Sequence, residues 1–265
     1  MEGVIPGSAG ETPASQQKTM DKTIQNVEEA LAGVEDGAVI AIGGFFAAGV
    51  PRILLRTLIA SKIKNLTLAC GSGPLLGAKE ELNGLLANGQ IKKVIDSYGL
   101  FRSATKGAQH LFEQQIRAGE IELEVYPMGT LCEKYRMAGA GIAACYMPVG
   151  TGSMVEESTI TNVEENRKPR ETRVIDGRPC ILEYALKPDF AFIHAHTGDS
   201  EGNLCYRKTA RNFNHVMAMA ARVTIAEVEN LVAPGELNPE SVHTPGIFVQ
   251  RVIPVPRITF DITDL

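Results

Sequence analysis

The sequence predicts an α/β fold, with a mostly parallel sheet, helices on both of its faces and a β-hairpin flap. Short apolar runs alternate with segments whose apolar residues recur every three or four positions. Such a β-then-α order is typical of a parallel sheet covered by helices. In addition, Asp176-Gly177 separates two strand-like runs, TRVI and RPCILEYAL, which is a strong signal for a two-residue hairpin turn.

The first expected element is an amphipathic helix within residues 20–34. Its apolar residues recur at helical spacing: Ile24, Val27, Leu31 and Val34. The strands expected after it are residues 38–42, 66–70, 91–97 and 121–127. The helices that alternate with these strands are residues 52–63, 79–89, 105–119 and 129–139. Apolar and charged residues alternate in the fourth strand, so we expect it near an edge of the sheet.

The second half of the chain is expected to contain more strand than helix. Residues 150–172 are polar without an apolar period, so they predict the longest loop. The hairpin follows this loop, and residues 189–195 and 222–229 are further apolar runs that predict strands. No internal repeat is visible.

Composition limits the classes of protein to consider. The chain has 265 residues, 44% of them hydrophobic, which is enough to bury a sizeable core in one domain, expected over residues 20–265. Residues 1–19 are rich in Gly, Pro, Ala, Ser and Gln and predict a disordered extension.

A net charge of −5 and the lack of a long apolar run argue against nucleic acid or a membrane as a partner. The five widely spaced cysteines are typical of reduced thiols in a cytoplasmic protein and predict no metal site.

Glycine-bearing segments follow four successive expected strands. They are Gly43-Gly44-Phe45, Gly71-Ser72-Gly73-Pro74, Ser97-Tyr98-Gly99 and Pro127-Met128-Gly129. In a parallel α/β sheet, ligands bind beyond the carboxyl ends of the strands, where these segments are expected. A tight turn explains any one of them, but four in succession favour a ligand site. The first segment lacks both the G-x-G-x-x-G spacing of a dinucleotide site and the G-K-[ST] of a phosphate loop.

The stretch DGAVIAIGGFFAAGVP, residues 36–51, resembles the signature of family I coenzyme A transferases, in the subunit called alpha or A. Among these enzymes the chain is similar to the 3-oxoacid CoA-transferases. The resemblance runs from Met20 to about Ile253. It includes the turn and Gly-rich loop within residues 121–152 and the motif GNLCYRKTARNFN of residues 202–214.

The resemblance implies exchange of an acyl group between coenzyme A and a carboxylic acid. In the family the nucleophile that attacks the thioester is a glutamate of the beta subunit, so no catalytic residue is expected in this chain. The resemblance also implies that this chain has a beta subunit for its partner, in a heterodimer or heterotetramer. A CoA thioester is then a substrate, and no cofactor is permanently bound. The substrate-binding residues that it suggests are Gly43, Gly44, Phe45, Phe46, Gly49, Ser97, Tyr98, Met128 and Gly129.

The resemblance also gives roles to the loop after the first strand. Its glycines would let the backbone approach the substrate closely, and Phe45 and Phe46 would keep out water, which hydrolyses an anhydride.

The chain departs from the family pattern at two places. The family commonly has glutamine in a P-Q-G-T turn, where this chain has Met128, a residue without a hydrogen to donate. The family sequence S-S-Y-V-G-E-N is here DSYGLFR, residues 96–102, which lacks the glutamate and the asparagine. Both changes leave the identity of the acid open.

Three further groups of residues have open interpretations. Arg52 is either a counter-charge for a second carboxylate, together with Arg102, or an arginine exposed to solvent. His194 and His196 would share one face of a strand, but no third metal ligand stands at a recognisable spacing. The cations Arg207, Lys208 and Arg211 would contact either the phosphates of CoA or the surface and subunit interface.

Three functions are therefore considered. The first is the alpha subunit of a heteromeric CoA-transferase. The second is a subunit of a CoA-thioester hydrolase or lyase with the same fold, in which the lost polar groups have redirected the chemistry. The third is a non-catalytic scaffold that shapes a partner.

Overall fold

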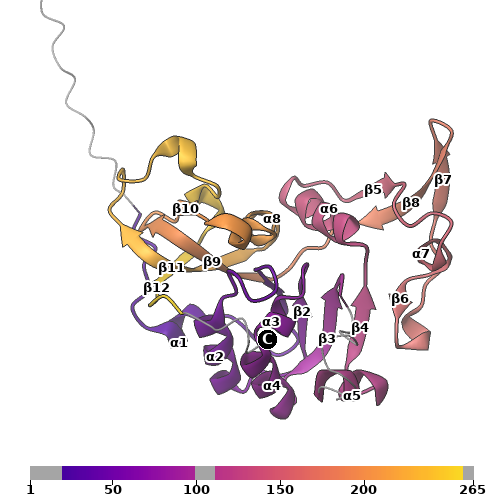
Figure 1. The fold of residues 1–265 in the computed structure, drawn as a ribbon, viewed down its shortest axis with the longest axis horizontal. Coiled ribbons are helices and arrows are strands. Elements are labelled where there is room, and N and C mark those ends of the chain that lie inside the picture. The colour runs from indigo at the N-terminus through magenta and orange to yellow at the C-terminus, as the bar shows by residue number, and fades with distance from the viewer. Residues whose placement is uncertain (1–19, 99–110, 259–265) are drawn as a thin grey trace, which may run out of the picture.

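The computed structural model describes residues 20–98 and 111–258. In this part of the chain, nine strands form one mixed sheet in the order β12-β11-β9-β1-β2-β3-β4-β6, with β10 paired to β9 (Figure 1). The predicted α/β fold with a mostly parallel sheet is confirmed, because β6 and β10 are the strands that run antiparallel to their neighbours. The strands are β1 (Val39–Ile42), β2 (Leu66–Ala69), β3 (Ile91–Asp96), β4 (Glu122–Val125), β6 (Ile160–Thr161), β9 (Phe190–Asp199), β10 (Leu204–Cys205), β11 (Val223–Val232) and β12 (Arg251–Pro254).

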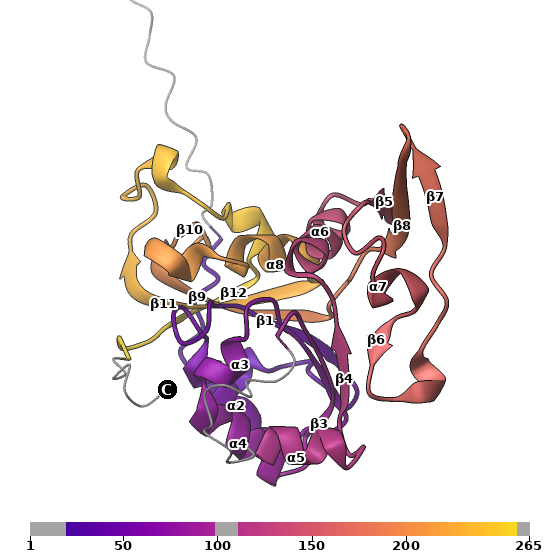
Figure 2. The same ribbon diagram turned by 45° about the vertical axis from the view of Figure 1, so that its right-hand side comes forward.

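Helices cover both faces of this sheet (Figure 2). One face carries α1 (Val27–Ala30), α2 (Arg52–Ser61), α3 (Pro74–Gly77), α4 (Lys79–Ala87) and α5 (Leu111–Arg117). The other face carries α6 (Met128–Gly139) and α8 (Asn214–Ala220). Two core clusters result, because alternate strand residues point to opposite faces. In β1, Ile40 and Ile42 belong to the first cluster and Ala41 to the second.

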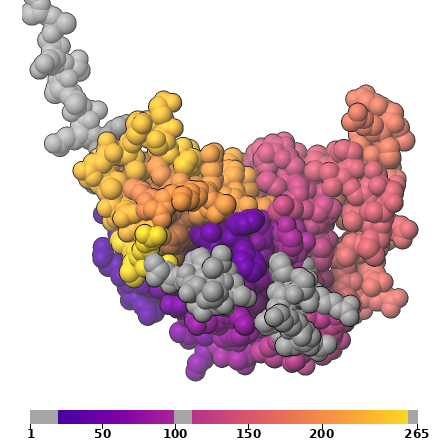
Figure 3. Space-filling view, viewed as in Figure 1, coloured from indigo at the N-terminus to yellow at the C-terminus, as the bar shows by residue number. Residues whose placement is uncertain are grey.

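A smaller antiparallel sheet of three strands forms the predicted flap. Its order is β5 (Ala144–Met147), β8 (Arg178–Tyr184) and β7 (Thr172–Ile175). The turn between β7 and β8 is confirmed as a two-residue hairpin, in which Asp176 and Gly177 have φ angles of 49° and 74°. Positive φ at both positions matches the twist of paired strands. The flap projects from one side of the molecule (Figures 1 and 3).

The expected first helix is wrong before Val27 and after Ala30, because α1 spans only Val27–Ala30. Residues 22–24 are extended beside β12 instead, where Ile24 N–H donates to the carbonyl of Val252 at 2.8 Å. Asn26 begins α1, because its side chain accepts a hydrogen bond from Glu28 N–H at 3.0 Å. The apolar residues of the predicted stripe still pack in or against the first core cluster, so their spacing reflects burial rather than a continuous helix.

The expected loop over residues 150–172 is also wrong in part. It contains α7 (Met154–Glu157), the edge strand β6 and a 3-10 turn, η1 (Glu164–Asn166). The two residues of β6 pair antiparallel with Val125 and Glu124, which confirms that β4 lies next to an edge. Residues 1–19 and 99–110 lie outside the described part of the chain. The predicted N-terminal extension and the start of the helix expected over residues 105–119 therefore lie outside it as well.

Candidate functional site

Four connecting loops meet at one edge of the main sheet. Strands β1, β2, β3 and β4 are mutually parallel neighbours, so their carboxyl ends lie at the same edge. The loops that follow them hold residues 43–51, 70–73, 97–98 and 126–127, with Met128 and Gly129 in the first turn of α6. The structure therefore brings the sequence-predicted site residues to one edge of the sheet. Their role in substrate binding stays a prediction.

The loop after β1 is fixed by backbone hydrogen bonds. Phe45 N–H donates to the carbonyl of Ala48 at 2.8 Å, and Ala48 N–H donates back to Phe45 at 2.9 Å. Phe46 N–H donates to the carbonyl of Ser72 at 3.0 Å, which joins this loop to the one after β2. Phe46 has a φ of 49°, a strained conformation for a bulky residue. Such strain persists where the surrounding structure holds it, and it clusters at functional sites.

Two glycines of this loop are explained by packing within the chain. A Cβ on Gly43 would collide with the side-chain oxygen of Asn214. Gly49 has a φ of 68°, and a Cβ there would lie 2.6 Å from the Cβ of Ala210. By contrast, a Cβ on Gly129 would meet no described atom within 4 Å. Close approach of a substrate is therefore better accommodated at Gly129 than at Gly43.

Three large apolar side chains at this edge remain exposed to solvent. Phe45, Tyr98 and Met128 are 42%, 42% and 41% exposed and come from two loops and the first turn of α6. Apolar groups gathered beyond the carboxyl ends of parallel strands can receive the acyl chain of a substrate.

Two buried polar residues link these loops, and sequence patterns assigned a role to neither. The hydroxyl of Ser72 donates to the sulfur of Met128 at 3.4 Å. The carboxylate of Asp96 accepts hydrogen bonds from the backbone N–H groups of Ser97 at 2.7 Å and Gly73 at 3.4 Å. Burial raises the pKa of Asp96 to about 7, although these N–H groups favour the charged form. An aspartate at the end of an apolar strand was the available signal, but its burial depends on loops distant in sequence.

Two buried hydroxyls lie close in sequence to the site residues. Within the described residues, Ser97 Oγ and Thr130 Oγ1 are buried and have no hydrogen-bond partner. Buried polar groups normally find a partner. These two hydroxyls are therefore candidates to bind a polar group of a ligand.

Arg52 is not exposed to solvent, contrary to one of the two interpretations of the sequence. Its side chain lies in a buried ion pair, with Nη1 2.6 Å from the carboxylate of Glu81 and Nη2 2.7 Å from the carbonyl of Gly77. This pair joins α2 to α4. It explains how an arginine is accommodated in the first turn of a helix, where the dipole disfavours a cation. Arg102, its suggested companion, lies outside the described residues.

His194 and His196 share one face of β9, as expected. Both bind the same carboxylate, with His194 Nε2 3.2 Å and His196 Nδ1 2.8 Å from the oxygens of Glu229. His194 Nδ1 also lies 3.0 Å from the buried carboxylate of Glu227. Burial opposes protonation of His194, but hydrogen bonds and charges of the two glutamates outweigh it and raise its pKa. Among residues 20–98 and 111–258, no His, Cys, Asp and Glu cluster is suited to a metal ion.

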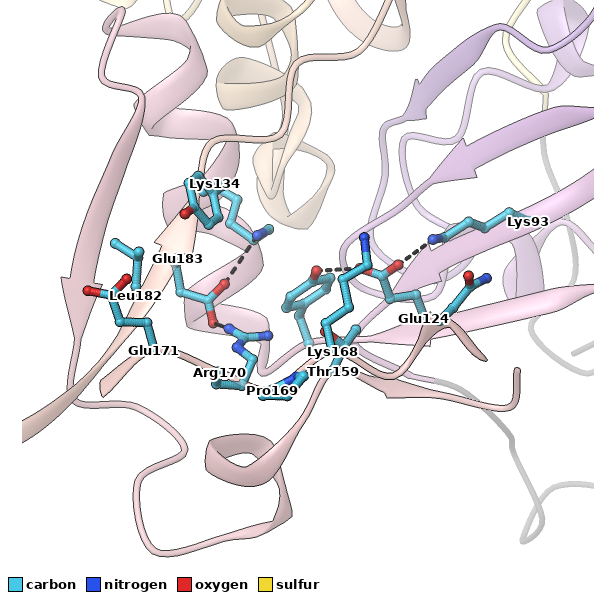
Figure 4. Close-up of a pocket in the computed structure, with 13 residues that line it drawn as sticks. Lys93, Glu124, Lys134, Thr159, Lys168, Pro169, Arg170, Glu171, Leu182 and Glu183 are labelled. Carbon is cyan, nitrogen blue, oxygen red and sulfur yellow. Dashed lines mark hydrogen bonds and ion pairs between the residues drawn. The ribbon is translucent and has the colours of Figure 1, made fainter. Parts of the chain in front are cut away.

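A cavity of about 560 Å³ lies between β3, β4 and the flap (Figure 4), and none of the predicted site residues lines it. Most of its charged groups form ion pairs with one another. Lys134 and Arg170 both bind the carboxylate of Glu183, and Lys93 binds Glu124. We interpret this cleft as the anchor of the flap rather than as a substrate site.

Comparison with known proteins identifies the family. The family model described as Coenzyme A transferase matches residues 24–254. The A subunit of 3-oxoadipate CoA-transferase from Pseudomonas putida is 43% identical over 89% of this chain and 94% of its own length. The A subunit of a probable succinyl-CoA:3-ketoacid coenzyme A transferase from Mycobacterium bovis is 40% identical over 90% of this chain and 95% of its own.

Solved structures share the fold. Glutaconate coenzyme A-transferase from Acidaminococcus fermentans superposes with a TM-score of 0.74 at 22% identity, over 89% of this chain and 76% of that one. A variant of the decarboxylase AibA/AibB has a TM-score of 0.70 at 25% identity, over 89% of this chain and 84% of its own. No helix within the described residues is long and apolar enough to cross a bilayer. The family match and the relatives at 40–43% identity show that the chain belongs to the coenzyme A transferase family, among subunits named A.

Proposed function

We propose that this chain is the A subunit of a heteromeric CoA-transferase that moves coenzyme A between an acyl-CoA and a short-chain or 3-oxo acid. The observation that supports it most is the 43% identity, over 89% of the chain, to a relative named as the A subunit of 3-oxoadipate CoA-transferase. The exposed side chains of Phe45, Tyr98 and Met128 supply an apolar surface of the kind that an acyl group needs. The unpaired cysteines of the chain favour a cytoplasmic location.

In the proposed reaction the nucleophile is a glutamate of the partner subunit. Its carboxylate attacks the thioester carbonyl, the C–S bond breaks, and the CoA thiolate leaves an acyl-glutamyl anhydride. The thiolate then attacks the glutamyl carbonyl and releases the first acid, so the enzyme holds a glutamyl-CoA thioester. The second acid repeats these two steps in reverse order. This chain binds the acyl group and limits access of water, which would hydrolyse the anhydride.

A second candidate is a CoA-thioester lyase or hydrolase subunit. The similarity to the decarboxylase AibA/AibB at 25% identity favours considering it. So does Met128, which offers no hydrogen to a developing oxyanion.

An assay with the co-expressed partner subunit tests the proposal. The complex receives succinyl-CoA and a 3-oxo acid, and the products are separated by chromatography. Formation of 3-oxoacyl-CoA with free succinate supports the transferase. Free CoA or carbon dioxide in place of a new thioester would support the second candidate. If the partner is active without this chain, the chain would be a non-catalytic scaffold.

A further inference from the structure

A second cavity, of about 220 Å³, lies beside the loop after β1. Residues 47–50 of that loop form one wall, and β9, β11 and residues 207–210 form others. We call it the cationic pocket and define it by the charged and imidazole side chains His194, His196, Arg207, Lys208, Glu229 and Arg257.

Three cations of the cationic pocket have no acidic partner. Within the described residues, no carboxylate lies within ion-pair distance of Arg207, Lys208 or Arg257. Arg52 also lines the cavity, but Glu81 matches its charge. All three residues are exposed, so solvent screens their mutual repulsion, but their gathering at one cavity still favours a bound anion.

The acidic residue of the lining does not cancel this charge. The carboxylate of Glu229 is bound by both histidines, at 3.2 Å and 2.8 Å. These contacts occupy both of its oxygens. One carboxylate does not balance three cations, so the lining keeps an excess of positive charge.

The segment that carries Arg207 and Lys208 packs against the loop after β1. Asn214 donates a hydrogen bond to the carbonyl of Ala210 at 2.6 Å, and Gly49 packs directly on Ala210. Lys208 is held at a φ of 54°, in the left-handed region. The loop that holds Phe45 therefore also lines the cationic pocket, through residues 47–50.

We propose that the cationic pocket binds an anionic group of a substrate, a carboxylate or a phosphate, while the acyl group lies across the loop at Phe45. Guanidinium groups bind both kinds of anion through paired hydrogen bonds, and an ammonium group adds a point charge. The anion is either the second carboxylate of a dicarboxylic acid or a phosphate of CoA. This assignment of the ligand to a substrate rests on the proposed function.

The test measures equilibrium binding, so it does not depend on turnover. The complex of this chain with its partner subunit is titrated with CoA and, separately, with succinate in a calorimeter. The variants are Lys208→Met and Arg257→Met, and the controls are Lys92→Met and Arg178→Met, exposed cations elsewhere on the chain. Each variant is expected to weaken the binding of one probe roughly 10-fold, and this effect should be smaller at high salt. The controls should leave the affinities for both probes unchanged.

The outcomes separate the possible sources of the anion. Weaker binding of CoA alone assigns the pocket to a phosphate, and weaker binding of succinate alone assigns it to a carboxylate. Variants that bind both probes as the controls do would overturn the proposal. If the variants weaken the binding of a probe but the unmodified complex transfers no acyl group, the pocket is an anion site and the proposed function is wrong.

Discussion

The hydroxyl of Ser72 donates a hydrogen bond to the thioether sulfur of Met128 across 3.4 Å. The two residues follow β2 and β4, so the contact spans the end of β3, which lies between those strands. The backbone carbonyl of Ser72 also accepts a hydrogen bond from Phe46 N–H. Ser72 thus ties together the loops after β1, β2 and β4, and it fixes the side chain at position 128.

This contact makes position 128 a direct test of the site. In Met128→Gln the amide oxygen can still accept from Ser72, while the amide N–H is free to donate to the thioester oxygen. We expect kcat to rise roughly 10-fold with a smaller change in KM, because the new bond strengthens as oxyanion charge develops. Met128 is 41% exposed, so the new amide is not buried without a partner.

Two controls accompany that measurement. Met154→Gln changes a methionine on α7 that is 66% exposed and should leave kcat unaltered. Met128→Ala removes the thioether and should alter the preference among acyl chains. If neither substitution at position 128 changes turnover or acyl preference, Met128 does not lie at the active site.

The buried carboxyl of Asp96 predicts a pH-dependent stability. The pKa of Asp96, about 7, lies above that of an unfolded aspartate. The stability that this shift contributes is therefore fully present below about pH 4 and is lost as pH rises through 7. Asp96→Asn keeps an oxygen for the backbone N–H groups but cannot ionise. We expect the variant to gain roughly 2–3 kcal/mol relative to wild type between pH 5 and pH 8, measured by urea unfolding. A difference that stays constant with pH would show that Asp96 does not titrate in this range.

We expect the buried ion pairs of Glu183 to hold the flap in place. The carboxylate lies 3.1 Å from Lys134 Nζ and also binds Arg170. In Glu183→Gln two buried cations lose their partner, which should cost about 3–5 kcal/mol of unfolding free energy and expose the flap to proteases. The matched control is Glu171→Gln, which breaks an exposed pair with Arg173 and should cost at most about 1 kcal/mol. Equal losses in the two variants would contradict a role of Glu183 as the anchor.

The N-terminal residues 1–19 are predicted to be dispensable, because their composition does not support burial. A chain that begins at Met20 should assemble with the partner and keep the melting temperature of the full chain. A drop of more than a few degrees would assign these residues a structural role.

Local patterns in the sequence predicted much of the fold and the meeting of the glycine-bearing segments at one edge of the sheet. Parallel strand order brought four glycine-bearing loops to one edge, and Asp176-Gly177 marked the hairpin. The strand β6 was not predictable, since two residues without an apolar period form it by pairing with β4. The first helix failed because pairing with β12 overrides helical spacing around Ile24.

The polar residues of the site were harder to predict. Arg52 is buried because Glu81, 29 positions later in the chain, matches its charge. Asp96 is buried by loops that its own neighbourhood does not specify. Long-range pairs of this kind leave no local signal, whereas glycine spacing and apolar periods do.

In the proposed function this chain supplies no nucleophile and completes a site whose glutamate belongs to its partner. The most direct measurement is to treat the complex with hydroxylamine during turnover with succinyl-CoA and to map the modified carboxyl group by mass spectrometry. Hydroxylamine converts an activated carboxyl group to a stable hydroxamate. We expect modification of one glutamate in the partner subunit, and no transfer by this chain alone. A hydroxamate on any carboxylate of this chain would contradict the division of the active site between two subunits.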